Sequence, residues 1–392
     1  MIPSLLFWVG VALFIYVYVG YPAILWLLGR LRRAGPAPEH DGYEPSVSII
    51  IAAHNEETVI EDKIRNTLSL DYPAHKLQVL VGSDGSTDRT ENLARRHEPA
   101  IMLVRSESQV GKTSILNLAV DQASGEILLF TDANVLLQPD AVRNLVRHFV
   151  DPRVGCAVGR VTYWNHAETG IAEGEGLYWR YELGLREAES KIGNLAMGSG
   201  PIMALRARLF AALDPDVQED FVLPLRVVTL GCRCIYDHTA VSQERLYQST
   251  SQDMFASKAR IVCMDLRGLL RNRRLLNPCR YPLVSWALLS HKLLRWLVPY
   301  FLIALFGVNL LLVHQPFYRF TLIAQVVCYA LAGAGYLWQR TGRKPPLIVG
   351  IPSSFCLVNA AAAVGVARFL MGNKSGRWTP VRPSTHADEG VP

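Results

Sequence analysis

Residues 125–136 place a carboxylate and an amide at the end of an apolar run. Positions 127–130 have the length and the β-branched or aromatic content of a buried strand, and Asp132 and Asn134 follow it directly. In a parallel sheet with helices on both faces, ligands collect beyond the carboxyl ends of the strands. Oxygen-bearing side chains at that place suit Mg²⁺ or Mn²⁺, with a diphosphate filling the remaining coordination positions. The alternative is an Asp132 that only caps the following turn.

Two other loops carry acids that the same argument places at this edge. Glu56 follows an apolar run at 47–53, and Asp84 follows another at 77–82. Two carboxylates about 4 Å apart repel by roughly 4 kcal/mol at an effective dielectric of 20. Converging acids therefore require a cation, a protonated member or wide spacing, and a bound metal meets this requirement. The alternative is that the segment DGSTD at 84–88 supplies ordinary turn and cap residues.

Alternating strands and helices are needed to bring these loops together. The predicted strands are 47–53, 77–82, 101–104 and 127–131, and the predicted helices are 57–70, 88–97, 112–123 and 139–149. This alternation predicts a mostly parallel, doubly wound α/β sheet with right-handed crossovers. The later pattern is less regular and predicts strands at 154–161, 195–205 and 232–236 and helices at 173–191 and 218–230.

The composition is too apolar for a purely soluble enzyme. The chain has 392 residues, of which 50% are hydrophobic, and its mean hydropathy is +0.16. Residues 5–28 contain no charge and would extend about 36 Å as a helix, enough to cross a hydrocarbon core of roughly 30 Å. Three further apolar segments of spanning length lie at 297–313, 320–338 and 347–370. We therefore expect a multi-pass membrane protein with α-helical transmembrane segments.

Basic residues predict the orientation of these segments. Basic residues follow the first apolar segment, at positions 30–33. A cleaved signal peptide would have its basic residues before the apolar segment. By the positive-inside rule the amino terminus lies outside and the chain after residue 31 is cytoplasmic. We expect the membrane to be the plasma (inner) membrane. If successive segments cross the membrane in alternate directions, loop 339–346 is cytoplasmic, which agrees with its basic residues. The same alternation puts the tail 374–382 outside, whereas its basic residues favour the inside. One segment would then be interfacial or re-entrant, and the sequence leaves open which one.

A basic stretch precedes the last three apolar segments. Between residues 258 and 296, Lys or Arg occupies positions 258, 260, 267, 271, 273, 274, 280, 292 and 295, against a single acid, Asp265. This block favours an anionic lipid surface over nucleic acid, because stacking aromatics and groove-binding motifs are not evident. We expect residues 267–296 to lie along the membrane, with Trp286 and Trp296 at headgroup depth.

Two other short motifs could be mistaken for a zinc site and a nucleotide-binding P-loop. Cys232 and Cys234 form only a CxC, and without a second pair nearby they do not predict a zinc site. The scattered cysteines instead favour reduced thiols in a cytosolic environment. The segment GKT at 111–113 does not predict a P-loop, because Ser106 stands where that motif requires its first glycine.

Short motifs follow one another in a specific order. They are SIIIAAHNE at 48–56, DGSTD at 84–88, GK at 111–112, LN at 116–117, TDAN at 131–134, SGP at 199–201, ED at 219–220 and an arginine at 260. As a set, covering roughly residues 45–295, they resemble the family 2 glycosyltransferases with a GT-A fold. The resemblance is to the membrane-anchored branch that includes hyaluronan, cellulose and poly-N-acetylglucosamine synthases.

The resemblance implies roles for individual residues. Asp220 would be the catalytic base, and Asp132 would hold a metal on the diphosphate, with Asn134 as a second ligand. The donor would be bound by Glu56, Asp84, Lys112 and Arg260. Glu56 and Asp84 would hold the nucleotide base and ribose, and Arg260 would contact the diphosphate. An inverting transfer of this kind uses one carboxylate as a base while cations stabilise the departing diphosphate.

The chain departs from the family pattern in two motifs. The usual DxD reads DAN at 132–134, and the QxxRW pentad reads SKARI at 257–261, so processive polymer synthesis is not implied. Simpler explanations also exist for three features. The acids at 219–220 favour a helix start, Arg260 could bind lipid headgroups, and the aromatic residues of helix 173–191 could pack or face the membrane rather than form an acceptor platform.

The expected organisation follows from these observations. It comprises a transmembrane helix at 1–33, a cytoplasmic GT-A domain at 34–262, a basic amphipathic interface region at 263–296, three transmembrane segments within 297–371 and a polar tail at 372–392. The expected activity is inverting hexosyl or N-acetylhexosaminyl transfer from a UDP-linked sugar to a polysaccharide or lipid-linked saccharide, alone or with other synthase subunits. The alternatives are transfer to a polyprenyl phosphate and an inactive nucleotide-sugar-binding scaffold.

Overall fold

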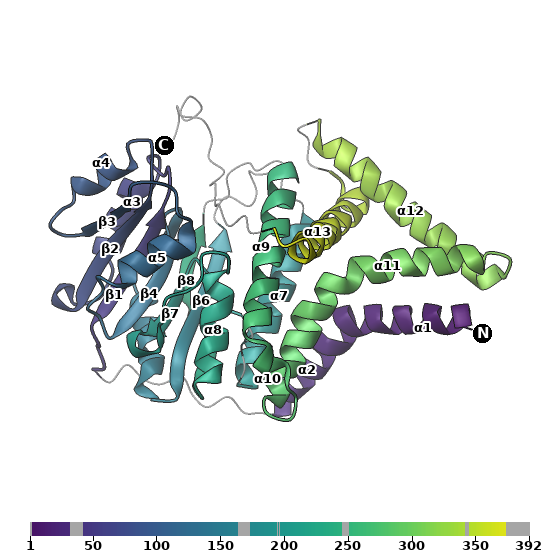
Figure 1. Ribbon diagram of the computed structural model, residues 1–392, viewed down its shortest axis with the longest axis horizontal. Helices are drawn as coiled ribbons and strands as arrows, with labels where there is room; N and C mark the ends of the chain where they lie inside the picture. The colour runs from purple at the N-terminus through teal and green to yellow at the C-terminus, as the bar shows by residue number, and fades with distance from the viewer. Residues whose placement is uncertain are drawn as a thin grey trace.

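The computed structural model describes residues 2–31, 42–163, 173–193, 195, 197–244, 251–341 and 345–373. Figure 1 shows two parts side by side, a sheet flanked by helices and a group of long helices that carries the amino terminus at its far end. The predicted basic tail at 374–382 lies outside the described residues, as do residues 342–344 of the predicted cytoplasmic loop.

Within the described residues, one mixed sheet has the strand order β3-β2-β1-β4-β7-β6-β8-β5. The strands are β1 (Val47–Ala53), β2 (Leu77–Asp84), β3 (Met102–Ser106), β4 (Ile127–Asp132), β5 (Val135–Leu137), β6 (Val154–Tyr163), β7 (Met203–Arg206) and β8 (Arg233–Glu244). The first four pair in parallel, as the alternating pattern predicts, and β7 runs antiparallel to β4 and β6. The carboxyl ends of β1, β2 and β4 therefore share one edge.

Helices cover both faces of the sheet because side chains alternate along each strand. Ile49 and Ile51 pack against α3 (Ile60–Leu68), α4 (Thr90–Arg95) and α6 (Ala141–Val146). Ile50 and Ala52 belong to the opposite core, with α5 (Lys112–Val120), α8 (Glu219–Thr229) and α9 (Ser251–Arg271). Short 3₁₀ turns complete the domain at η2 (Ala74–Lys76), η3 (Arg147–Val150), η4 (Ala207–Leu209) and η5 (Arg273–Leu276).

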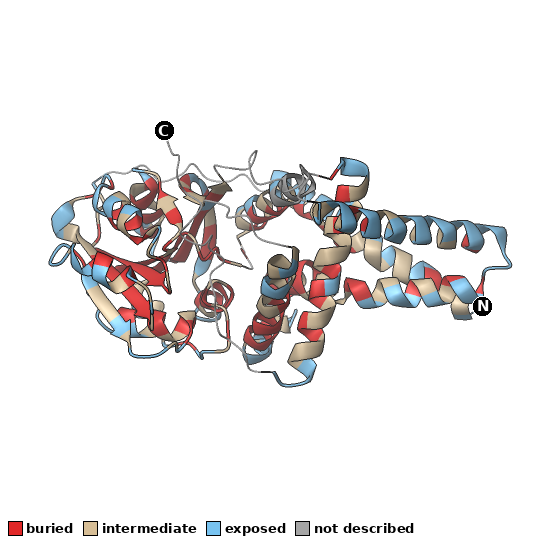
Figure 2. Cartoon of the chain, turned by 90° about the horizontal axis from the view of Figure 1, so that it is seen from above, coloured by how far each residue is buried: buried red, intermediate tan, exposed pale blue. Residues whose placement is uncertain are grey.

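Four helical stretches in the described part of the chain are long and apolar enough to cross a membrane, at Ile2–Leu31, Pro282–Leu311, Pro316–Gln339 and Leu347–Leu370. Their elements are α1 (Ile2–Ile15), η1 (Tyr16–Gly20), α2 (Tyr21–Leu31), α10 (Pro282–Ala287), η6 (Leu288–Leu293), α11 (Leu294–Leu311), α12 (Pro316–Gln339) and α13 (Leu347–Leu370). Figure 2 shows the sheet largely buried and α12 largely exposed, and Ile303, Phe320 and Ile348 expose most of their apolar surface. Such a surface suits lipid rather than water.

The second candidate span begins earlier than expected. We expected residues 267–296 to lie along the membrane, whereas the stretch from Pro282 continues through position 296. The physical reason is that its charges have partners on α7 (Glu173–Lys191). Arg295 pairs with Glu182, and His291 Nδ1 lies 2.6 Å from Glu189 Oε1. Paired charges can be buried where isolated ones cannot.

The long aromatic helix α7 packs against the first membrane helix. Tyr181 donates a hydrogen bond to the Tyr18 carbonyl at 3.3 Å, and Tyr21 donates one to Glu189 at 2.7 Å. These contacts favour the packed-helix interpretation for Tyr181. The side chains of the other two aromatic residues, at 178 and 179, lie outside the described set.

The sheet domain and the membrane helices share one hydrophobic core. Trp296, Ala362 and Val366 join the same cluster of buried residues as α8 and α9. At Gly365 in α13, a Cβ atom would lie 2.7 Å from the carbonyl oxygen of Ala259 in α9, so glycine allows the two backbones to approach. The sheet domain is therefore packed directly on the candidate transmembrane helices.

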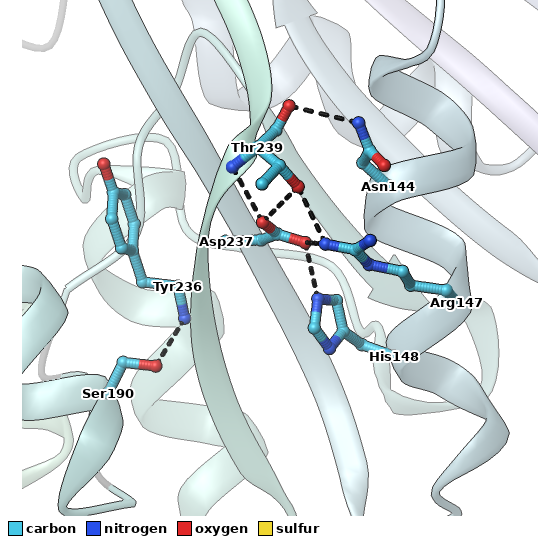
Figure 3. A network of polar contacts seen from close by, with 7 residues as sticks. All are labelled: Asn144, Arg147, His148, Ser190, Tyr236, Asp237 and Thr239. Carbon is cyan, nitrogen blue, oxygen red and sulfur yellow. Dashed lines mark hydrogen bonds and ion pairs between the residues drawn. The ribbon is translucent and has the colours of Figure 1, made fainter. Parts of the chain in front are cut away.

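A buried carboxylate, Asp237, fixes a bulge in β8 (Figure 3). Its Oδ2 accepts hydrogen bonds from Arg147 at 2.7 Å and His148 at 2.6 Å, and its Oδ1 accepts them from the backbone and hydroxyl of Thr239. The β6–β8 register shifts directly after the pair formed by Gly159 and Asp237. This network therefore sets the register of the end of β8, which pairs with β5.

We expect Asp237→Asn to lower the free energy of unfolding by about 3–5 kcal/mol, the usual cost of removing one partner of a buried ion pair. Burial alone would raise the pKa of Asp237, but hydrogen bonds from His148, Thr239 and Arg147 outweigh it and hold the pKa well below its usual range. The native state thus favours the ionised form. The stabilisation is complete above about pH 4 and declines as the pH falls further.

Denaturant unfolding in detergent at pH 7 and pH 3 measures this effect, and the gap between wild type and variant should narrow at pH 3. Asp151→Asn is the control, because Asp151 pairs with the largely exposed Arg153 and should cost under about 1 kcal/mol. Equal stability of Asp237→Asn and wild type at pH 7 would contradict the prediction.

Candidate active site

The loops after β1 and β2 are locked to each other. Asn55 adopts a left-handed conformation with φ of 53°, and its Oδ1 accepts the backbone N–H of Thr87 at 2.8 Å. The N–H of Glu57 donates to Asp88 Oδ2 at 3.1 Å. Glu56, expected to bind the donor, is fully buried between these contacts. The two motifs therefore form one structural unit at the sheet edge.

Asp84 is buried at the end of β2, and its carboxylate accepts backbone hydrogen bonds. Its Oδ1 accepts the N–H of Val110 at 2.7 Å, and its Oδ2 accepts that of Gly111 at 3.0 Å. Asp84 and Asp132 end strands that flank β1, which puts them roughly 10 Å apart at a strand spacing of about 4.8 Å. They share the same edge, and the contacts of Asp84 position the residue that follows Gly111.

That residue, Lys112, connects two of the acidic motifs. Its Nζ lies 2.6 Å from Asp132 Oδ1 and 2.7 Å from Glu219 Oε1. Burial alone would lower the pKa of Lys112, but the two carboxylates outweigh burial and raise it. Burial raises the pKa of the Glu219 carboxyl, and Lys112 opposes part of that rise. Lys112 is thus a fixed positive charge held between two acids.

Asp220 lies beside this cluster at the start of α8. The carboxylate is half-buried, and its Oδ2 accepts the N–H of Gly200 at 3.3 Å. A Cβ atom at Gly200 would lie 3.4 Å from Lys112 Nζ and 3.7 Å from Asp220 Oδ2. In the SGP motif at 199–201, Gly200 therefore places backbone without a side chain next to Lys112 and Asp220.

Arg260 completes the cluster from α9. Burial lowers its pKa, and the carboxylates of Glu219, Asp220 and Asp265 oppose that change. Burial raises the pKa of Asp265 to about 8, and the neighbouring Asp220 and Glu219 add to the rise. Arg260 thus lies in the field of the acids at 219–220, close to the expected base. In the sequence, Asp265 was visible only as the single acid of the basic stretch, and it was not assigned to the site.

The side chains of the two expected metal ligands, Asp132 and Asn134, contact different partners. Asp132 faces Lys112, whereas the amide nitrogen of Asn134 donates to Glu244 Oε1 at 3.1 Å. Within the described residues, no group of three His, Cys, Asp or Glu side chains is arranged to hold a metal. Asp132 Oδ1 and Glu219 Oε1 are both paired with Lys112 Nζ. In the described contacts the other carboxylate oxygen of Asp132 has no such pairing, and it fits a divalent cation that takes its remaining ligands from a diphosphate.

Sequence reasoning missed a lysine behind this loop. Lys63 in α3 is fully buried, and its Nζ donates to Thr131 Oγ1 at 2.9 Å and to the Val135 carbonyl at 2.5 Å. Burial lowers its pKa to about 7, and Asp132 opposes part of that change. Its position on a buried helix face was the available signal, because a lysine there needs a partner.

The sequence and the fold are similar to those of known proteins. Residues 48–213 match the family model for Glycosyl transferase family 2. The chain is 27% identical over 250 residues to an N-acetylglucosaminyltransferase of Rhizobium sp. (strain N33), covering 59% of this chain and 55% of that protein. It is 29% identical over 170 residues to a beta-monoglucosyldiacylglycerol synthase of Synechocystis sp., covering 42% of this chain and 36% of that protein. The chain thus spans about half the length, or less, of these relatives.

A solved structure shares the whole architecture. It is the mannosyltransferase PcManGT from Pyrobaculum calidifontis in complex with GDP-Man and Mn²⁺, which is 22% identical and superposes with a TM-score of 0.71. The match covers 94% of this chain and 99% of that one. The chain therefore has a GT-A fold together with four candidate transmembrane helices, and residues 48–213 within it are similar to the family 2 glycosyltransferases.

Proposed function

We propose that this chain is an inverting glycosyltransferase that moves a sugar from a nucleotide sugar to an acceptor at a membrane surface. The observation that carries the proposal is the cluster in which Lys112 contacts both Asp132 and Glu219, next to Asp220, at the ligand-binding edge of a family 2 domain. This reaction needs a carboxylate to remove the proton of the acceptor hydroxyl and cations to stabilise the leaving diphosphate. It requires no covalent intermediate.

Each part of the cluster has a proposed role. Asp220 is the base, because its half-buried carboxylate lies at the cluster without a direct ion pair to Lys112 in the described contacts. Lys112 and Arg260 provide positive charge for the diphosphate. Asp132, with Asn134, would hold Mg²⁺ or Mn²⁺, which supplies further charge stabilisation to the diphosphate when bound.

The donor is proposed to be a UDP-linked hexose or N-acetylhexosamine. The similarity to an N-acetylglucosaminyltransferase supports the sugar class. Asp84 ends β2 and Glu56 lies in the loop after β1, at the carboxyl edge where α/β sheets bind ligands, which supports their role near the base and ribose. Because the structural relative was solved with GDP-Man, guanosine donors belong in any test.

The acceptor is proposed to be a polysaccharide or lipid-linked saccharide at the cytoplasmic face of the inner membrane. Two observations support this location. The catalytic part packs directly on α11 and α13, through Trp296 and Val366, and basic residues follow the first apolar helix. The similarity to a beta-monoglucosyldiacylglycerol synthase supports acceptors that reside in a bilayer. Further synthase subunits would be additional partners.

A panel of nucleotide sugars tests the proposal. Membranes containing the chain should release nucleoside diphosphate from one UDP-sugar in the presence of Mn²⁺ and acceptor lipids, and Asp220→Asn membranes should not. A product that extracts into organic solvent would assign a lipid or polyprenyl-phosphate acceptor instead of a polymer. Absence of both transfer and hydrolysis with every UDP- and GDP-sugar would contradict the proposal and favour an inactive scaffold.

A further inference from the structure

Lys63 is buried where an apolar residue would normally lie. It is among the largest fully buried side chains of the described chain, although lysine is almost never fully buried without a partner. Its amine donates hydrogen bonds to the hydroxyl of Thr131 and to the carbonyl of Val135. These residues bracket the segment that carries Asp132 and Asn134.

A second side chain of α3 holds the far end of the same segment. The Asn66 amide donates to the Leu137 carbonyl at 2.9 Å, and its oxygen accepts the Leu137 N–H at 2.8 Å. Lys63 and Asn66 are three residues apart and so share one face of the helix. Segment 131–137 is therefore fastened to α3 at both ends by side chains.

We propose that Lys63 is a positioning residue that fixes the 131–135 turn and thereby directs the Asp132 carboxylate toward the metal and the donor diphosphate. This inference rests on the proposed function. Lys112 contacts the Oδ1 atom of Asp132, whereas Lys63 holds the hydroxyl of Thr131 and the backbone carbonyl of Val135. A turn held in this way loses little freedom when the donor binds, because its conformation is already set.

A leucine or methionine would fill the volume of Lys63 without burying an amine. Replacing buried charged groups with apolar residues of similar size is often neutral or stabilising. Packing alone therefore does not require a lysine at this position. What the lysine adds is a pair of hydrogen bonds to the turn, and these affect the geometry of residues 131–135 rather than the core as a whole.

Lys63→Met tests the inference by two readouts. Hydrogen exchange of the amides at 131–137 should become at least about tenfold faster, and the Mn²⁺-dependent Kd for UDP should rise about 10–100-fold, as is usual when support for a metal ligand is lost. Thr67→Val is the matched control, because Thr67 is a buried residue of the same helix whose hydroxyl bonds only within α3, to the Lys63 carbonyl, in the described contacts. It should leave both readouts unchanged.

Two results would overturn the inference. One is unchanged exchange at 131–137 in Lys63→Met, and the other is an equal change in Thr67→Val. If Lys63→Met does not fold, Thr131→Val removes one acceptor while keeping the lysine, and it should accelerate exchange in the same segment. Wild-type protein that binds no nucleotide with Mn²⁺ would contradict the proposed function, whereas the exchange measurement would still decide the role of Lys63.

Discussion

Asp220→Asn is expected to abolish turnover while leaving donor binding intact. Asparagine has the size of aspartate, and its amide oxygen can still accept the Gly200 N–H that Asp220 Oδ2 accepts at 3.3 Å. It cannot take a proton from the acceptor hydroxyl. Because general bases contribute about 10²–10⁴-fold to rate, kcat should fall by that factor. The Kd for nucleotide diphosphate, measured by calorimetry with Mn²⁺, should change by less than about threefold.

Asp216→Asn is the matched control for this variant. Asp216 lies four positions earlier and pairs with Arg271 at 2.7 Å, with no contact to Lys112 among the described contacts, so its loss should leave kcat near the wild-type value. Wild-type turnover in Asp220→Asn would refute the assignment of the base. The neighbouring Glu219, whose Oε1 faces Lys112, would then be the next residue to test.

Most of the parallel half of the sheet was predictable because β1, β2 and β4 are mostly buried on both faces, whereas the edge strand β3 is not. Such strands appear in sequence as continuous apolar runs, and β1 and β4 begin at the residues expected for them. β5 was not predicted, because its three residues are too few to show a pattern and it depends on pairing with β8. The antiparallel placement of β7 between β4 and β6 likewise depends on contacts distant in sequence.

The number of candidate spans agrees with the four predicted from the sequence. The expected surface position of residues 267–296 stays a prediction, because the candidate span from Pro282 is defined by length and composition alone. The Lys and Arg residues at 267–295, Arg295 among them, indicated a surface helix because charges without visible partners rarely enter an apolar stretch. The structure pairs the neighbouring His291, and also Arg295, within the protein. Their partners, Glu189 and Glu182, lie 102 and 113 positions away on α7. Sequence periodicity reports neighbours within one helix and not such distant pairs.

The acidic motifs were predictable as a set, but their pairwise contacts were not. The motif pattern named Asp132, Asp220 and Lys112, yet only the fold shows that Lys112 contacts Glu219 rather than Asp220 directly. Adjacent acids at a helix start are equivalent in sequence and differ only in the direction of their side chains. Lys63 was overlooked for a different reason: a lysine within a polar helix is usually exposed, so nothing marked this one as buried.

Asp132→Asn is expected to remove the metal dependence of donor binding. In the described structure Asp132 offers its Oδ1 to Lys112, and a divalent cation bound at this carboxylate would bring the diphosphate to the same place. An amide oxygen is a weaker ligand, since it carries no net charge. The Kd for UDP in Mn²⁺ should rise at least about tenfold, because even loss of an outer-shell partner costs about 10–100-fold in metal affinity.

The same variant should behave differently without metal. With Asp132 neutral, Lys112 retains Glu219 as its paired carboxylate, and more of its positive charge is available to the diphosphate. The Kd for UDP in EDTA should therefore stay constant or fall slightly, and the ratio of the two Kd values should approach one. Asp140→Asn, at an exposed residue before α6, should preserve the wild-type ratio. If Asp132→Asn keeps the wild-type ratio of the Kd in EDTA to the Kd in Mn²⁺, the metal takes its protein ligands from other residues. A change in the charge of Lys112 could not by itself produce a response to Mn²⁺.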